Sequence, residues 1–159
     1  MELDSLDLRI IEELSKNARV KLSELSRKLA VPRTTISSRI EKMVKMGVIK
    51  SFTTMLDYST LGYKFLAFVM IKVRRGTGKL TDQVSITKKI VEDINRSNSK
   101  LRIIESHIVT GEYDVLLKVI AKDWSELTKF LIEYLTKLSE IEHTNTMLVL
   151  TTVHEGMVL

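Results

Sequence analysis

The chain has 159 residues, of which 44% are hydrophobic and 28% charged, as in globular proteins large enough to bury a core. No apolar run approaches the roughly 18 residues that span a bilayer, and the acidic, amphipathic N-terminus is unlike a signal peptide. The absence of cysteine excludes disulfides and thiol chemistry, so we expect a cytoplasmic protein. A net charge of +5 favours a polyanionic partner without separating DNA from RNA or a membrane surface.

The first segment predicts a helix that starts at Asp4 or Ser5 and stops near Asn17. Either residue can cap the helix, and Asp7 suits the positive end of its dipole. Four apolar residues recur on one face: Leu6, Ile10, Ile11 and Leu14. We expect this helix to pack across the next two and complete a three-helix core.

Residues 22–50 are typical of a helix-turn-helix. Two apolar stripes stand at helical spacing: Leu22, Leu25 and Leu29, then Ile36, Ile40 and Met43. Ala30-Val31-Pro32 interrupts the period, and Pro32, which lacks an N–H, suits the start of a helix. Gly47 reads as the left-handed residue that ends the second helix.

Positive charge is concentrated in this region. Residues 17–50 hold nine Lys and Arg against Glu24 and Glu41, a local net charge of +7. Small hydroxyls let a helix approach base edges, whereas Lys and Arg reach phosphates. The base-reading candidates are Thr34, Thr35 and Ser38, flanked by Ser37; the phosphate candidates are Arg33, Arg39, Lys42 and Lys45. The alternatives are an ordinary solvated face and, for Arg39, an ion pair with Glu24 or Asp7.

Strand-like residues follow Gly47, which suggests a wing or a connecting strand. Residues 57–62 (Asp-Tyr-Ser-Thr-Leu-Gly) gather turn formers and a glycine, so we expect a short hinge there. The expected domains are residues 1–50 for DNA binding, 51–63 as connecting strand and hinge, and 64–159 as a second domain.

The second half alternates strands and helices. The expected elements are a strand at 65–73, a helix at 79–96, strands at 102–110 and 113–121, a helix from Asp123 to Leu138 and a strand at 144–153. We expect Leu80, Val84, Thr87, Val91 and Ile94 to face inward on the first helix, and Trp124, Leu127, Leu131, Tyr134 and Leu138 on the second. The order β-α-β-β-α-β predicts a ferredoxin-like domain and an α+β fold class overall.

Both faces of this sheet are expected to be apolar. Ala67, Val69 and Ile71 alternate with Leu66, Phe68 and Met70 along the first strand. A strand that is apolar on both sides needs cover on both sides, and the helices cover only one. We therefore expect a homodimer that packs through its sheets, which also suits two-fold DNA half-sites.

Catalysis and metal binding find little support. The three histidines, His107, His143 and His154, show no metal-ligand spacing of the HExxH or CxxC type, and there is no phosphate-binding glycine loop. We expect no enzyme activity, no metal and no cofactor.

The chain resembles the Lrp/AsnC (feast/famine) family of transcription regulators over essentially its whole length. The motifs that carry the resemblance are Leu6-Asp7, Asn17-Ala18-Arg19, Glu24-Leu25, Thr35-Ile36, Arg39-Ile40, Gly47-Val48-Ile49, Thr110-Gly111-Glu112-Tyr113-Asp114 and the following VLLKVIA. The resemblance implies an N-terminal winged helix-turn-helix and a C-terminal ferredoxin-like effector domain. It also implies dimers that assemble into octamers or other higher oligomers, with small molecules, usually amino acids, bound at contacts between effector domains.

The effector-site candidates follow from this resemblance. Gly111, Tyr113 and Asp114 match the family's loop, and Thr144 and Thr146 lie on the strand expected beside it. Amide N–H groups at the glycine turn suit a carboxylate, and Asp114 suits an ammonium group. Alternatively, Gly111 serves only a positive φ and Asp114 only satisfies turn amides. His107 and His143 are further candidates for lining the pocket.

Three departures from the family pattern limit what can be inherited. Ala30-Val31-Pro32 replaces the usual Gly-Leu-Ser, Lys21 stands where a capping hydroxyl is frequent, and residues 74–100 look longer than usual, so that their helix can be displaced. The operator and the effector therefore do not carry over.

The sequence thus predicts a regulator that binds double-stranded DNA specifically, contacts no membrane and responds to a small metabolite. The alternatives are an architectural DNA-coating protein and, less favoured, an enzyme, because some sirohaem decarboxylases resemble the same two-domain plan. The basic segment and the scarcity of histidines argue against the enzyme.

Overall fold

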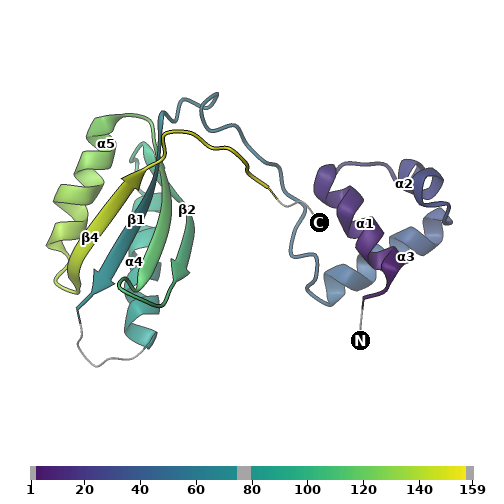
Figure 1. Ribbon diagram of the computed structural model, residues 1–159, viewed down its shortest axis with the longest axis horizontal. Helices are drawn as coiled ribbons and strands as arrows, with labels where there is room; N and C mark the ends of the chain where they lie inside the picture. The colour runs from purple at the N-terminus through teal and green to yellow at the C-terminus, as the bar shows by residue number, and fades with distance from the viewer. Residues whose placement is uncertain (1–2, 75–79, 157–159) are drawn as a thin grey trace. The chain divides into compact units, whose positions relative to one another are not determined.

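A computed structural model describes residues 3–74 and 80–156, which divide into two compact units (Figure 1). The first unit holds the described residues up to Leu56 together with those from His154 onward, and the second holds Asp57–Val153. Lys79, where the fourth predicted helix was expected to start, lies outside the described residues, as does the side chain of Leu80.

The first unit is built from the helices α1 (Ser5–Lys16), α2 (Leu22–Leu29) and α3 (Arg33–Lys45). Helix α1 begins with a capping box: the Asp4 carboxylate accepts from the amides of Leu6 and Asp7, and the Asp7 carboxylate accepts from the amide of Asp4. Such a cap contributes about 1 kcal/mol. The helix ends at Asn17, as predicted.

Apolar residues from all three helices form one core: Ile10, Leu25, Leu29, Ile36 and Met43 are buried, with Leu6, Ile11, Leu14 and Ile40 packed around them. The predicted stripes are therefore confirmed, with one correction. Leu22 is 39% exposed, because it is the first residue of α2 and lies beyond the edge of this core.

The turn between α2 and α3 has a left-handed alanine. Ala30 has φ +57° and ψ +40°, and its amide donates to the carbonyl of Ser26. Among the described residues it is the one non-glycine with positive φ. Gly47, with φ +73°, ends α3 as predicted, and the amides of Val48 and Ile49 donate to the carbonyl of Met43.

The strand expected after Gly47 is absent from the described chain. Residues 50–57 have no assigned strand, because no other described segment forms a ladder beside them. The predicted hinge at 57–62 is an ordered turn. The Asp57 carboxylate accepts from the amides and hydroxyls of Ser59 and Thr60, and Gly62 has φ +84°.

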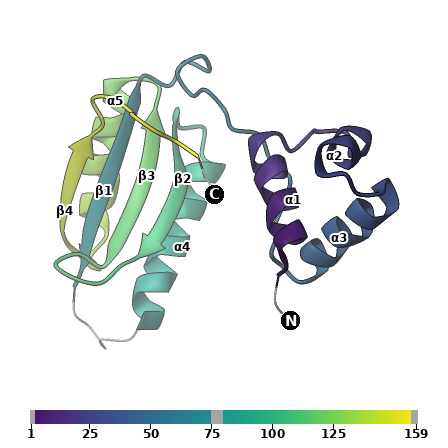
Figure 2. The ribbon, with the colours of Figure 1, turned by 45° about the vertical axis from the view of Figure 1, so that its right-hand side comes forward.

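The second unit is a four-stranded antiparallel sheet with its helices on one face (Figure 2). Its elements are β1 (Phe65–Val73), α4 (Leu80–Arg96), β2 (Leu101–Ile108), β3 (Val115–Ala121), α5 (Trp124–Thr128), a π-helical turn η1 (Lys129–Tyr134), a 3₁₀ turn η2 (Leu135–Lys137) and β4 (Ile141–Leu148). The strand order β2-β3-β1-β4 confirms the ferredoxin-like prediction.

The core of this unit lies between the sheet and the helices. Val69 and Ile71 of β1 and Leu117 of β3 are fully buried against Ile90 of α4 and Leu127 of α5. The opposite face of β1 carries the partly buried Leu66, Phe68 and Met70, with Leu116 of β3 and the exposed Met147 of β4 beside them. The predicted apolar alternation on both faces is therefore present.

Two predicted boundaries and two core residues are wrong. On α4 the buried core residues include Ile86 and Ile90, which were not predicted, whereas the predicted Val84 is outside the core. The last strand runs over Ile141–Leu148 instead of 144–153, and the hairpin loop extends over 109–114. Trp124 is 56% exposed and packs edge-on against Phe65, with ring centroids 5.8 Å apart. The π-helical turn changes the helical period, so that Phe130 and Leu135 become buried beside Leu127.

Candidate nucleic-acid interface and effector loop

Helix α3 presents a polar face opposite its buried residues Ile36 and Met43. Thr34, Ser38 and Lys45 stand on that face at helical spacing and are exposed. No side chain in the described part of the chain caps the helix, so its first-turn amides remain available beside the hydroxyl of Thr34. The helix therefore offers donors at its N-terminal end, where a recognition helix contacts bases.

Three of the predicted phosphate contacts are unpaired cations. Within residues 3–74 and 80–156, Arg33, Lys42 and Lys45 have no ion-pair partner, and all three belong to α3. Cations that are not already neutralised can replace the counterions of a phosphate backbone. Lys28, another basic residue of this region, is instead paired with Glu13 of α1.

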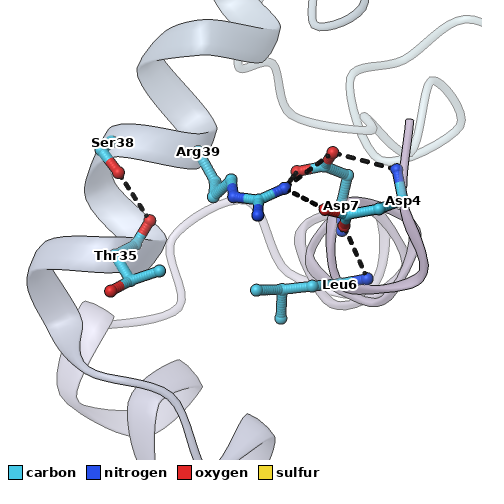
Figure 3. Close-up of polar contacts among 6 residues, drawn as sticks. All are labelled: Asp4, Leu6, Asp7, Thr35, Ser38 and Arg39. Atoms are coloured by element: carbon cyan, nitrogen blue, oxygen red, sulfur yellow. Dashed lines mark hydrogen bonds and ion pairs between the residues drawn. The ribbon is translucent and has the colours of Figure 1, made fainter. Parts of the chain in front are cut away.

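Two hydroxyls on α3 already donate hydrogen bonds inside the helix. The Ser38 hydroxyl donates to the carbonyl of Thr35 over 2.9 Å (Figure 3), and the Ser37 hydroxyl donates to the Glu41 carboxylate over 3.3 Å. A serine oxygen that donates its proton keeps two acceptor lone pairs. Ser38 is therefore suited to accept from an amino group, such as that of adenine or cytosine.

Glu41 is a further hydrogen-bond acceptor on this face, and it was not among the predicted DNA-binding residues. It lies one helical turn after Ser37 and Ser38, is exposed, and can accept from the amino group of cytosine. In the sequence, Glu41 stands out only as a negative charge within a basic segment. Its helical spacing from Thr34 was the signal that places it on the same face.

Arg39 points to α1 (Figure 3). One guanidinium nitrogen lies 3.1 Å from the Asp7 carboxylate, and the same nitrogen also contacts Asp4. The amide of Asp7 and then the Arg39 guanidinium hold the pKa of Asp4 below its usual value. Asp4, and next Asp7, raise the pKa of Arg39. The ion-pair alternative with Asp7 is thus the arrangement present in the structure, and Glu24 does not take part.

In the loop 109–114, where the effector site was predicted, the Asp114 carboxylate is bound within its own domain. Its carboxylate accepts from the amide of Val73 and from the side chain of Gln83 on α4, each over 3.0 Å, and lies 3.2 Å from the ammonium of Lys72. The Asp114 side chain is only 16% exposed. This carboxylate joins the ends of β1 and β3 to α4.

The other effector candidates lie on different sides of the sheet. Thr144 and Thr146 are paired with Ile71 and Val69, whose side chains face the helices. The ring of Tyr113 packs edge-on against His143, 5.5 Å away, and His143 is paired with Lys72 on the opposite face. Gly111, with φ +122°, has open space where a Cβ would stand. His107 is exposed beside Glu105.

Neither a metal centre nor a membrane span is found in the described residues. No three His, Cys, Asp or Glu side chains among them are grouped to hold a metal ion. No described helix is long and apolar enough to cross a bilayer.

Known proteins resemble the chain over both units. A family model for winged helix-turn-helix DNA-binding domains matches residues 3–50, and one for the Lrp/AsnC ligand binding domain matches residues 66–159. An uncharacterized HTH-type transcriptional regulator of Pyrococcus furiosus is 38% identical over 153 residues, which cover 96% of each chain. The HTH-type transcriptional regulator FL11 of the same organism is 36% identical over 148 residues, covering 93% of this chain and 89% of FL11.

Two solved structures share the fold. AsnC of E. coli superposes with a TM-score of 0.82 at 27% identity and covers 99% of each chain. A transcriptional regulator of Neisseria meningitidis, solved as a complex with L-Met, superposes with a TM-score of 0.85 at 20% identity, covering 99% of this chain and 96% of the regulator.

Proposed function

The chain belongs to the Lrp/AsnC family of HTH-type transcription regulators, and on that premise we propose that it binds specific double-stranded DNA sequences under the control of a small metabolite. The observation that carries the proposal is the exposed face of α3, which combines hydroxyls, first-turn amides that no described side chain caps, and cations without an ion-pair partner among the described residues. A protein that binds the chromosome acts where the chromosome lies, so we also propose a cytoplasmic location.

In this proposal, the N-terminal half of α3 makes the base contacts that determine DNA sequence specificity. Thr34 and Thr35 can donate to base acceptors in the major groove, whereas Ser38 accepts, because its proton is held by the Thr35 carbonyl. Arg33, Lys42 and Lys45 would contact phosphates and set the position of the helix without reading sequence.

Two-fold association is supported by the sheet face that the helices leave uncovered. Leu66, Phe68 and Met70 alternate with the buried core residues of β1, and a second copy would bury them. Such a dimer presents two recognition helices to two half-sites. Further association of dimers into octamers or other assemblies belongs to the same proposal.

For the effector we propose an amino acid bound where the loop of one effector domain meets another domain. The N. meningitidis regulator was solved with L-Met, which supports this ligand class. Gly111, Tyr113, Asp114, Thr144 and Thr146 remain the proposed site. The division of Tyr113 and the two threonines between faces favours a site completed by a second copy.

Salt-dependent binding to a preferred and a scrambled duplex tests the DNA-binding proposal. Lys42→Ala should weaken binding to both duplexes about equally and lower the salt slope by about one unit. Ser38→Ala should reduce discrimination by about 1–3 kcal/mol and leave the slope unchanged. An unchanged slope in Lys42→Ala would remove Lys42 from the phosphate contacts. Calorimetric titration with individual amino acids tests the effector.

The architectural alternative is favoured by one observation. Two of the α3 hydroxyls, those of Ser37 and Ser38, already donate within the helix, which leaves fewer donors to read bases. Equal affinity of the wild-type protein for the preferred and the scrambled duplex would support that alternative. The family and its relatives are transcription regulators, which weakens the decarboxylase alternative.

A further inference from the structure

Arg39 lies on α3 between the buried and the exposed face. The preceding residue, Ser38, is exposed, and the following residue, Ile40, packs against the core. From this border a guanidinium can reach either outward to a phosphate or back to α1. In the structure it reaches back to α1 (Figure 3), and the Arg39 side chain is 29% exposed.

The two carboxylates that bind Arg39 also build the start of α1. Asp4 is the N-cap, and Asp7 closes the capping box through the amide of Asp4. The Asp7 side chain is only 3% exposed. If Arg39 moved to a phosphate, the nearly buried carboxylate of Asp7 would lose its cationic partner, which is unfavourable away from water.

Arg39, Asp4 and Asp7 add a contact of defined geometry to an interface between α1 and α3 that is otherwise apolar. Ile10 of α1 shares one apolar core with Ile36 and Met43 of α3, and apolar contacts are not directional. A charge-assisted hydrogen bond has a preferred geometry. Within the described residues, Arg39 provides the ion pairs between α1 and α3, whereas Glu13 and Lys28 connect α1 to α2.

We propose that Arg39 is a positioning residue, which with Asp4 and Asp7 fixes the rotation of the recognition helix and thereby sequence discrimination, and that it contacts no phosphate. The inference rests on the proposed function. The rotation of α3 decides where the side chains of Thr35 and Ser38 point, so a small error displaces every base contact together. Phosphate contacts through long, flexible lysines tolerate such an error better.

The test measures affinity for a preferred and a scrambled duplex over a range of salt concentrations, with thermal unfolding as a check on folding. Arg39→Gln should lower the ratio of specific to nonspecific affinity about tenfold or more, the discrimination that a good base contact carries, and leave the salt slope unchanged. A slope lower by about one unit would overturn the proposal, because it would show a lost phosphate contact.

Asp4→Asn removes the charge and keeps the cap, because Asn caps helices about as well as Asp. It should lower the same ratio, and combining it with Arg39→Gln should add little further loss. Additive losses, an unchanged ratio, or tighter nonspecific binding with a steeper slope would each overturn the proposal. This variant decides the matter even if Arg39→Gln fails to fold.

Two controls separate the possible failures. Glu13→Gln breaks an α1 ion pair that does not reach α3, and should leave both ratio and slope unchanged; a drop in the ratio equal to that of Asp4→Asn would overturn the special role of Arg39. Lys42→Ala should lower the slope only. If the wild-type protein shows no discrimination, the proposed function fails, and the salt slope of Arg39→Gln alone decides whether Arg39 contacts phosphate.

Discussion

Replacing Ala30 by glycine should stabilise the helix-turn-helix unit. Ala30 ends α2 in the left-handed region, at φ +57° and ψ +40°, and its side chain is exposed. The left-handed conformation costs an L-residue about 1–2 kcal/mol, whereas glycine loses about 0.5–1 kcal/mol more conformational entropy on folding than alanine. The central values of these two ranges differ by about 0.75 kcal/mol, which is the expected gain, since no packing is lost.

Thermal unfolding of the full chain, followed by far-ultraviolet circular dichroism, measures this gain. For a unit of this size the midpoint should rise by about 3–6 °C, and hydrogen exchange at the amides of Leu25 and Leu29 should slow in parallel. Ala30→Val is the opposing control, because a β-branched residue is poorly tolerated at positive φ. Ala30→Gly and Ala30→Val variants of equal stability would refute the conformational argument.

Three further predictions concern other parts of the chain. Asn95→Ala should destabilise the effector unit to urea by about 1–3 kcal/mol, because the Asn95 amide pairs with both the N–H and the carbonyl of Ile103; Asn95→Ala with wild-type stability contradicts this. Asp114→Ala should abolish the response to effector in DNA-binding assays and keep effector-free binding, and an equal response would refute the site. Hydrogen bonds from Ser59 first, then Thr60, lower the pKa of Asp57 to about 2. The stability that these hydrogen bonds contribute is therefore fully present above the ordinary pKa of 3.8 and is lost as the pH falls through about 2. Ser59→Ala should weaken this dependence of stability on acid, measured by unfolding at a series of pH values.

The sequence was sufficient where a pattern has one structural solution. The capping residue Asp4, the helical stripes around Ile10 and Ile36, and Gly47 each predicted what the structure contains. The alternation along β1 also identified that strand at its observed ends. In these places local preference and burial agree.

The sequence patterns gave wrong boundaries or wrong core positions where the buried residues of an element do not follow a regular period. Strand β4 is an edge strand, and its exposed residues Glu142 and His143 conceal its true start. Trp124 has regular helical spacing from Leu127, but as the first residue of α5 it lies at the edge of the core and is exposed. The π-helical turn that follows changes the later core positions, which no regular period predicts. The sequence could not decide the partner of Arg39. Helical spacing shows on which face of the helix a residue lies, but a long side chain can extend from that face in several directions.

Selection of bound fragments from a random duplex library is the direct test of sequence-specific recognition by α3. The full chain would be used at about physiological salt, with an excess of nonspecific competitor DNA. We expect recovery of a pseudo-palindrome whose half-sites lie about one or more helical turns apart. Recovery of unrelated sequences without a shared motif would contradict specific recognition by α3.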